Sequence, residues 1–490
     1  MKKPVKTIAV ALAAVSALSA SVALTGCGGA KNDPTVLNIV ALNAGYGKQW
    51  LETLAEKFEA EHEGYTVNLD NAIYEAGSLI NSHINSRNNI DDLYICVGND
   101  WKTYAAAGKL AKLDDFLDEA VDGTTVKNKI ADEFANSVYY PDLDGTLHTY
   151  RLPWTAGVGG IYYNKAMFEQ NGWNVPTTYG ELVELCDKIV DDDIPVEGGG
   201  NKAQSVKPFV YTGQNIDYFD YAVYTWWAQL SGEENIREFM QYGSADNYDS
   251  AKSATYDNLK KATDMWKGLF GNSDYVMSGC SGMSNHEAQT AFNNGHAAMI
   301  FGGDWMYNEI LKYDINNENF EFALMKTPVA DDAVETSITY TIGEDQYIAI
   351  PESSTKKELA KDFIKLMISD YGCEVFLNQA HGVLAYKAAD IETEDAFLNN
   401  LITTKNSYEK AFTNYPSFTA DEIAGNAKIT DNRLLYLANT VDIWGTGALR
   451  PYATLIQANP QTLDKAFATI ASSIAGQWKD WQSDAGVTTG

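Results

Sequence analysis

Between residues 36 and 97 the hydrophobic pattern alternates between the period of a strand and the period of a helix. The run Val36–Ala41 is short and nearly continuously apolar, which is typical of a strand covered on both faces. The next apolar residues form one helical stripe, which consists of Trp50, Leu51, Leu54 and Phe58. Residues 66–69, 77–87 and 93–97 continue the series as strand, helix and strand. This order predicts an open α/β sheet at the start of the protein.

The same alternation returns after residue 155. Residues Gly160–Tyr163 are predicted to form a strand, and Thr178 with Glu181 matches a capping box that opens a helix. A second capping box, Thr355 with Glu358, is predicted to open the helix that carries Leu359, Phe363, Leu366 and Met367. Residues 191–200 are predicted to be a loop, because three adjacent aspartates repel one another and three adjacent glycines favour no ordered state.

Length and charge narrow the class of protein. The 490 residues suggest two or three domains, each large enough for a hydrophobic core. The chain carries 66 acidic and 36 basic residues, which gives a formal net charge of -30. Nucleic acid phosphates and anionic lipid headgroups carry the same sign. We therefore expect no nucleic acid partner, and a ligand that is neutral or cationic.

The N-terminus is typical of an exported protein. Lys2, Lys3 and Lys6 precede an apolar run from residue 8 to residue 24, which predicts a signal peptide over residues 1–26. A retained membrane helix is the weaker alternative, since the run is short for a span and contains three serines. The four residues that end at Cys27 resemble a bacterial lipobox, in which the cysteine is lipidated and becomes the mature N-terminus. We expect Cys27 to carry a lipid and residues 27–34 to form a flexible tether.

Common enzyme and metal motifs are absent from the sequence. It contains no G-x-S-x-G elbow, no H-E-x-x-H and no phosphate-binding P-loop. Asp142–Gly145 opens like a calcium loop but lacks the later acceptors, and its flanks predict a hairpin between residues 139–141 and 146–150. The many acidic residues leave open a carboxylate pair of the glycosidase type.

The cysteines also give no sign of a metal site. Cys96, Cys186, Cys280 and Cys373 have no CxxC spacing and no nearby histidine pair, so we predict no metal and no cofactor. The surroundings of Cys96 and Cys186 are apolar, which favours small core residues. Cys280 and Cys373 either form a disulfide or remain free, because the sequence does not report their separation.

Four segments occur in a characteristic order. The first contains Leu152–Trp154, Gly160–Lys165 and Pro176–Leu182; the second contains Phe292–Met299 and Gly302–Trp305; the third contains Ala360–Met367 and Gly382–Ala385. The lipobox is the fourth. Together they resemble the extracellular solute-binding protein family, the maltose-binding-protein-like sugar-binding lipoproteins of ABC importers, over nearly all of the mature chain. Residues that differ from the family's usual ones are Trp154, Met367 and Ala385, of which Trp154 bears on the cleft.

The resemblance implies a two-lobed α/β fold of the periplasmic-binding-protein-like type II, with three crossovers between the lobes and the ligand held in the cleft. It implies that residues 35–155 with 344–395 form lobe 1, and that residues 156–343 with 396–490 form lobe 2. It also implies a carbohydrate ligand, ABC permease subunits as partners and a monomeric state. The expected location is the outer face of the bacterial cytoplasmic membrane, with contact to the membrane through the lipid anchor only.

Open α/β sheets bind ligands beyond the carboxyl ends of their strands. The candidate ligand-binding residues that follow predicted strands are Tyr46, Asn99, Asp100, Trp101, Asp304 and Trp305. Further candidates, placed by the resemblance or in a late loop, are Trp154, Asp217, Tyr218, Glu344, Asp345 and Trp444. An aromatic ring packs against the C–H face of a sugar, while carboxylates and amides bind its hydroxyls. The alternatives are core positions for Trp101 and Trp154, a helix cap for Asp304, and ordinary loop positions for the rest.

Two functions remain open at this point. The first is the carbohydrate-binding component of an ABC importer, and the second is a secreted, lipid-anchored glycan hydrolase. A surface adhesin is not favoured, because the sequence contains no internal repeat. A bound oligosaccharide that a receptor returns unchanged, and that a hydrolase cleaves, distinguishes the first two.

Overall fold

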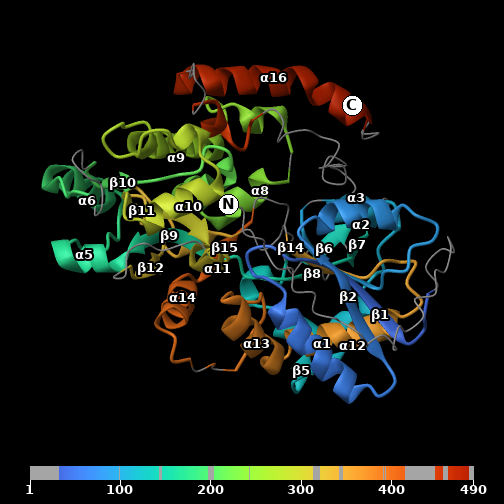
Figure 1. Cartoon of the computed structure of the whole chain (residues 1–490). Coiled ribbons are helices and arrows are strands. Elements are labelled where there is room, and N and C mark those ends of the chain that lie inside the picture. The colour runs from blue at the N-terminus through green and yellow to red at the C-terminus, as the bar shows by residue number, and fades with distance from the viewer. Residues whose placement is uncertain are drawn as a thin grey trace, which may run out of the picture.

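Two α/β halves, each built around its own sheet, make up the computed structural model of this protein (Figure 1). The structure describes residues 32–98, 100–142, 146–196, 204–241, 243–312, 320–341, 346–389, 391, 393–413, 447–455 and 462–484. Among these residues, no helix is both long enough and apolar enough to cross a membrane.

The first sheet has the strand order β2-β1-β3-β14-β8. Its strands are β1 (Val36–Leu42), β2 (Thr66–Ile73), β3 (Leu93–Val97), β14 (Gln346–Ala349) and β8 (Leu152–Pro153). The first three strands are parallel, as expected for the alternating pattern, and β14 runs antiparallel to both β3 and β8. The predicted α/β start of the chain is therefore confirmed.

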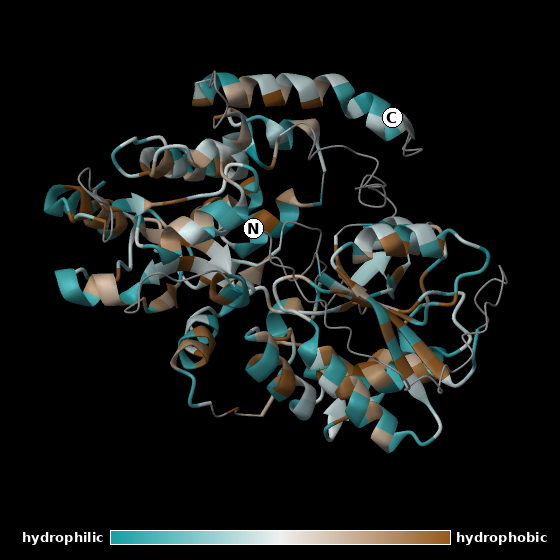
Figure 2. Cartoon of the chain, viewed as in Figure 1, coloured by the Kyte–Doolittle hydropathy of each residue, from teal (hydrophilic) through white to brown (hydrophobic). Residues whose placement is uncertain are grey.

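Helices cover both faces of this sheet, which explains why β1 and β3 are mostly apolar and buried, whereas the edge strand β2 is polar and partly exposed. Helices α1 (Gln49–Glu61), α12 (Lys357–Ile368) and α13 (Asp370–Ala380) share a buried cluster with Leu37 and Ile39 of β1. Helices α2 (Ala76–Ile84) and α3 (Asp100–Ala106) instead pack in a cluster with Val40. Figure 2 shows much of β1 in brown, whereas α1 and α12 carry both colours, as helices with one buried face do.

The second sheet has the strand order β10-β11-β9-β12. Its strands are β10 (Lys207–Phe209), β11 (Ala297–Gly303), β9 (Gly159–Asn164) and β12 (Phe322–Met325). The residues of β11 are divided between two buried clusters, one of which also contains residues of α6 (Tyr179–Asp192), α7 (Asp220–Ser231) and α9 (Ala254–Phe270). The other contains residues of α10 (Asn285–Asn293), α11 (Met306–Lys312) and α14 (Ala396–Asn406).

Further helices, short strand pairs and 3-10 turns complete the described part of the two halves. The remaining helices are α4 (Val126–Lys129), α5 (Lys165–Asn171), α8 (Glu233–Phe239) and α16 (Leu463–Asp484). Short strand pairs are β4 (Ala120–Val121) with β5 (Thr124–Thr125), β6 (Tyr139–Pro141) with β7 (Leu147–Thr149), and β13 (Ile338–Tyr340) with β15 (Lys410–Phe412). The 3-10 turns are η1 (Asp115–Asp118), η2 (Asp132–Phe134), η4 (Ile216–Phe219), η5 (Ala245–Tyr248), η6 (Cys280–Gly282) and η8 (Pro451–Thr454).

Three passages between the two halves can be followed along the described elements. The chain leaves the first sheet after β8 and enters the second sheet at β9, and it returns between β13 and β14. The third passage lies between α13, which packs on α1, and α14, which packs on β12. These passages agree with the three crossovers that the family resemblance implied.

The two predicted capping boxes had different outcomes. The Thr178 side chain accepts a hydrogen bond from the Glu181 N–H and Glu181 returns one, so the first box is confirmed. The second box is wrong: α12 begins after Lys356 and has no side-chain cap. The physical reason is that Lys356 is held by buried Asp92, at an Nζ to Oδ2 distance of 2.9 Å, and its N–H donates to Ser354 instead.

The hairpin and the cysteines can also be assigned. Strands β6 and β7 pair antiparallel, as predicted, although residues 143–145 of the turn lie outside the described residues. The predicted loop 191–200 begins later than expected, because α6 continues to Asp192.

Cys96, Cys186, Cys280 and Cys373 are all buried and free, so the alternative of a Cys280–Cys373 disulfide is not realised.

Candidate functional site

The loop after β1 meets the loop after β11 where the two halves touch. Tyr46 comes from the first loop, and its side chain is 7% exposed. Its phenol O–H donates to Oδ1 of Asp304 over 2.6 Å, and Asp304 is fully buried. The two residues are 258 positions apart in the sequence, so this hydrogen bond links the two halves directly.

Asp304 makes further hydrogen bonds at this point of contact. Its Oδ2 accepts the backbone N–H of Val383 over 3.2 Å, and its own N–H donates to the carbonyl of Val158 in the first crossover over 2.8 Å. Burial raises the pKa of Asp304 to about 7, and the hydrogen bonds from Tyr46 and Val383 act in the opposite direction. The carboxyl is therefore poised to change its protonation state near neutral pH.

Trp305 lies beside this contact and is half-buried. Its ring packs edge-on against Tyr218, at 6.1 Å between ring centroids, and at a tilt against Tyr221 at 5.8 Å. Gly45 allows the β1 loop to come this close, because a Cβ there would lie 2.7 Å from the Cβ of Trp305. Three aromatic side chains of the second half thus form a group that the first half covers.

Tyr218 and Asp217 belong to the 3-10 turn η4 before α7. Tyr218 is half-buried, and burial raises its pKa. Asp217 is exposed on the same turn. Four of the candidate residues therefore come together, namely Tyr46, Tyr218, Asp304 and Trp305, with Asp217 next to them in the chain.

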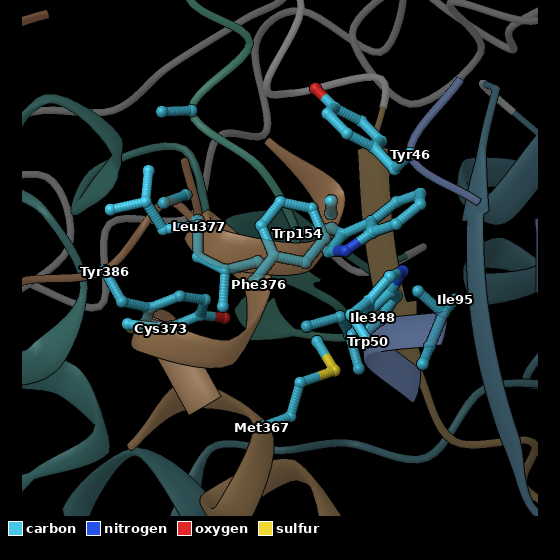
Figure 3. Packing of buried hydrophobic residues seen from close by; sticks show 14 of the residues in the cluster. Tyr46, Trp50, Ile95, Trp154, Ile348, Met367, Cys373, Phe376, Leu377 and Tyr386 are labelled. Carbon is cyan, nitrogen blue, oxygen red and sulfur yellow. The ribbon is translucent and has the colours of Figure 1, made fainter. Parts of the chain in front are cut away.

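Trp154 supports this group from inside the first half. It is 1% exposed and packs against Tyr46, Trp50 and Phe376, at centroid distances of 5.6, 5.9 and 6.2 Å (Figure 3). The core alternative for Trp154 is the one that the structure realises. Its contribution is to fix the ring of Tyr46.

Trp101 and Asp100 lie at the start of α3. Trp101 is 1% exposed and packs against Tyr140 at 5.2 Å, with the guanidinium of Arg151 at 5.0 Å from its ring. Trp101 is therefore a core residue as well, whereas Asp100 is exposed. Four further candidates lie outside the described residues, and these are Asn99, Glu344, Asp345 and Trp444.

Sequence reasoning did not select Tyr221, although it is part of the same group. It follows Tyr218 by three positions, and residues three apart share one face of a helical turn. This spacing could have identified it, because Tyr218 was already a candidate. Its ring is 1% exposed and lies over the start of β9, where a Cβ on Gly159 would be only 2.0 Å from its Cε1.

One cavity between the two halves lies away from the group around Trp305. A cavity of about 470 Å³ is lined by Asp132 and Glu133 on η2, and by Glu233, Arg237 and Lys410 on α8 and β15. Its walls are bridged by ion pairs such as that between Lys410 and Glu233, at 2.9 Å. The cavity contains none of the candidate residues, and its lining is about evenly polar and apolar. The group around Trp305 combines three aromatic rings with a buried carboxyl, whereas Phe412 is the one aromatic residue among the described ones that lines this cavity, so we take the group around Trp305 as the candidate site. In the described parts of the chain, no three His, Cys, Asp or Glu side chains are placed to hold a metal ion.

Comparison with known proteins gives a consistent result. The family described as bacterial extracellular solute-binding proteins matches residues 53–384, about two thirds of the chain. The multiple sugar-binding protein of Streptococcus mutans is 24% identical over 324 residues, which cover 65% of this chain and 67% of that protein.

Two solved structures show the same fold. RafE of Streptococcus pneumoniae, in complex with raffinose, has a TM-score of 0.62 and 16% identity, and covers 90% of this chain and 99% of its own. The GacH receptor of Streptomyces glaucescens, solved unliganded and with acarbose, has a TM-score of 0.62 and 16% identity, and covers 91% and 98%. The expected two-lobed type II fold is thus confirmed.

Proposed function

The chain belongs to the bacterial extracellular solute-binding proteins, and from this premise we propose that it captures a sugar or oligosaccharide between its two lobes and delivers it to the permease of an ABC importer. The observation that carries the proposal is the group of Tyr218, Tyr221 and Trp305 beside the carboxyl of Asp304. The names of its relatives, a multiple sugar-binding protein and a raffinose-bound protein, support the same substrate class.

The proposed lobes are residues 35–155 with 344–395, and residues 156–343 with 396–490. Support comes from the sheets, since β14 pairs within the first sheet and α14 packs against β12 of the second. The Tyr46–Asp304 hydrogen bond then joins the lobes. Binding of a ligand at Trp305 requires this contact to open, because Gly45 lies directly against the Trp305 side chain.

The proposed location is the outer face of the cytoplasmic membrane, where the lipid on Cys27 is the only membrane contact. Cys27 and the signal peptide lie outside the described residues, so this part rests on the lipobox in the sequence. The last tether residues are held against lobe 1, because Lys356 Nζ donates to the Asn32 side chain over 2.9 Å and to the Asp33 carbonyl over 3.0 Å. We propose a monomer with permease subunits and a carbohydrate as its partners.

We propose that the protein is a receptor and not a hydrolase. Hydrolysis of a glycan requires two carboxyl groups that reach the scissile bond. Both carboxylate oxygens of Asp304 already accept hydrogen bonds, from Tyr46 and from Val383. Asp217, the other candidate carboxylate beside the aromatic group, precedes Tyr218 on η4 and is exposed. This arrangement supports binding better than acid–base catalysis.

The test is a thermal-shift screen of the purified protein against monosaccharides and oligosaccharides. A ligand at about 100 times its Kd adds about 2.7 kcal/mol of stability, which raises the melting temperature measurably. Each sugar that stabilises the protein is then incubated with it and analysed by chromatography. We expect recovery of the intact sugar. Steady release of cleaved products would assign the protein to the hydrolases, and a complete screen without any stabilising sugar would contradict the proposed substrate class.

A further inference from the structure

Tyr221 carries a buried hydroxyl group without a hydrogen-bond partner among the described residues. The side chain is 1% exposed, and its oxygen is inaccessible to solvent. Most buried polar atoms in folded proteins are hydrogen-bonded, because an unpaired buried donor loses its interaction with water and gains nothing in return. An unpaired hydroxyl inside a candidate binding site therefore calls for an explanation by function.

The position of this hydroxyl is fixed by the surrounding elements. The ring packs against Trp305 at 5.8 Å and against Tyr340 at 5.7 Å between centroids. Its backbone carbonyl accepts a hydrogen bond from the Thr327 hydroxyl over 2.9 Å, and Gly159 provides the space for the ring. These contacts surround the ring of Tyr221 on several sides.

Three of the four ionisable groups that act on the hydroxyl belong to the candidate site. Burial, together with Tyr340, Asp304, Tyr46 and Tyr218, raises the pKa of Tyr221 well above its usual range. The phenol is therefore protonated at neutral pH and can donate a hydrogen bond. Tyr46 of the other lobe is among these groups, and it contacts Asp304 while Gly45 contacts Trp305. Separation of the lobes would therefore uncover Trp305 and Asp304 and open the side of Tyr221 that faces Tyr46.

We propose that the Tyr221 hydroxyl is a specificity-determining group that binds a hydroxyl of the sugar packed on Trp305. This inference rests on the proposed function and adds one defined contact to it. A sugar hydroxyl both donates and accepts, so it can satisfy the phenol and a neighbouring acceptor at once. A site built to bind a hydroxyl rejects an analogue that lacks it, because its own polar group then remains unpaired.

Tyr104 offers a matched control within the same chain. It is 4% exposed, its hydroxyl is also buried, and that hydroxyl lacks a hydrogen-bond partner within the described part of the chain. It lies on α3, in the cluster that contains Val40, Tyr94 and Cys96. Replacement of either tyrosine by phenylalanine removes one unpaired hydroxyl and keeps the ring. The two variants therefore lose the same group, Tyr221→Phe from the candidate site and Tyr104→Phe from the core around α3.

The experiment uses the full chain and the sugar with the largest thermal shift in the screen. Titration calorimetry measures its Kd for the wild type, Tyr221→Phe and Tyr104→Phe, and thermal unfolding without sugar measures stability. We expect both variants to melt at or above the wild-type temperature. Tyr221→Phe should weaken binding by about tenfold, equal to ~1.4 kcal/mol, while Tyr104→Phe should leave the Kd unchanged.

A series of monodeoxy sugars then identifies the partner of the hydroxyl. One deoxy position should weaken wild-type binding by a similar factor and have no further effect on Tyr221→Phe, as in a double-mutant cycle. If Tyr221→Phe binds the sugar as tightly as the wild type, the inference is wrong and the hydroxyl is satisfied by a buried water. If the wild type binds no sugar, the proposed function fails, and this inference fails with it.

Discussion

Asp304→Asn tests whether the carboxyl at the contact between the lobes titrates near neutral pH. The substitution keeps the size of the side chain and removes its ionisation. The amide oxygen of asparagine can still accept the hydrogen bond from Tyr46, whereas the amide nitrogen cannot accept the N–H of Val383. We therefore expect the variant to fold. Its free energy of unfolding should differ from that of the wild type by a constant amount, because one hydrogen bond is lost, and by a further amount that changes with pH.

The direction of the pH effect follows from the raised pKa. Burial raises the pKa of Asp304 from 3.8 to about 7, so between these values the folded protein retains a proton that the unfolded chain has lost. The stabilisation is complete below pH 3.8 and is lost as the pH rises through about 7. The rise is roughly three pKa units, and at about 1.36 kcal/mol for each unit the total change is ~4 kcal/mol.

Urea unfolding at a series of pH values from about 4.5 to about 8 provides the measurement, with the wild type and Asp304→Asn studied side by side. Asp220, whose pKa burial raises to about 6 despite Arg450, is present in both proteins and cancels in the difference. The wild type should lose ~3 kcal/mol relative to the variant over this range. A difference that stays constant within about 0.5 kcal/mol would show that Asp304 does not titrate there, and the reasoning would be refuted.

Three further substitutions, one of them with a matched control, test other parts of the proposals. Trp305→Ala should weaken sugar binding by at least about thirtyfold, or ~2 kcal/mol, since a central aromatic anchor is removed; an unchanged Kd in calorimetry would place the ligand elsewhere. Cys27→Ser should move the protein from the membrane fraction to the soluble fraction, and retention after a high-salt wash would contradict lipid anchoring. Gly159→Ala should lower stability by ~1 to 3 kcal/mol in urea unfolding, because the new Cβ would lie 2.0 Å from the Tyr221 ring, whereas Gly282→Ala, which meets no atom within 4 Å, should be nearly neutral.

Local patterns predicted the elements of the first lobe well. The stripe of Trp50, Leu51, Leu54 and Phe58 is the buried face of α1, and β3 spans the predicted residues 93–97. These signals are reliable because periodicity depends on which face of a single element is buried. The start of α12 was mispredicted because it depends on a contact between distant parts of the chain. Lys356 pairs with Asp92, which lies more than 250 positions away in the sequence.

The candidate site was only partly predictable. Strand ends indicated Tyr46, Asp304 and Trp305, because the carboxyl edge of an α/β sheet is a general place for ligands. The hydrogen bond between Tyr46 and Asp304 could not be predicted, since it depends on how one lobe lies against the other. The sequence also could not separate the half-buried Trp305 from the fully buried Trp101 and Trp154, because each follows or lies near a strand.

The place of β14 in the first sheet also determines when this lobe can fold during synthesis. β14 lies between β3 and β8, yet it follows β3 by about 250 residues. At ~5 to 20 residues per second, the ribosome needs ~12 to 50 s to supply it. Throughout that interval one edge of β3 has no neighbour, and an unpaired strand edge is a template for aggregation. A chain that ends before residue 346 would keep this edge permanently exposed.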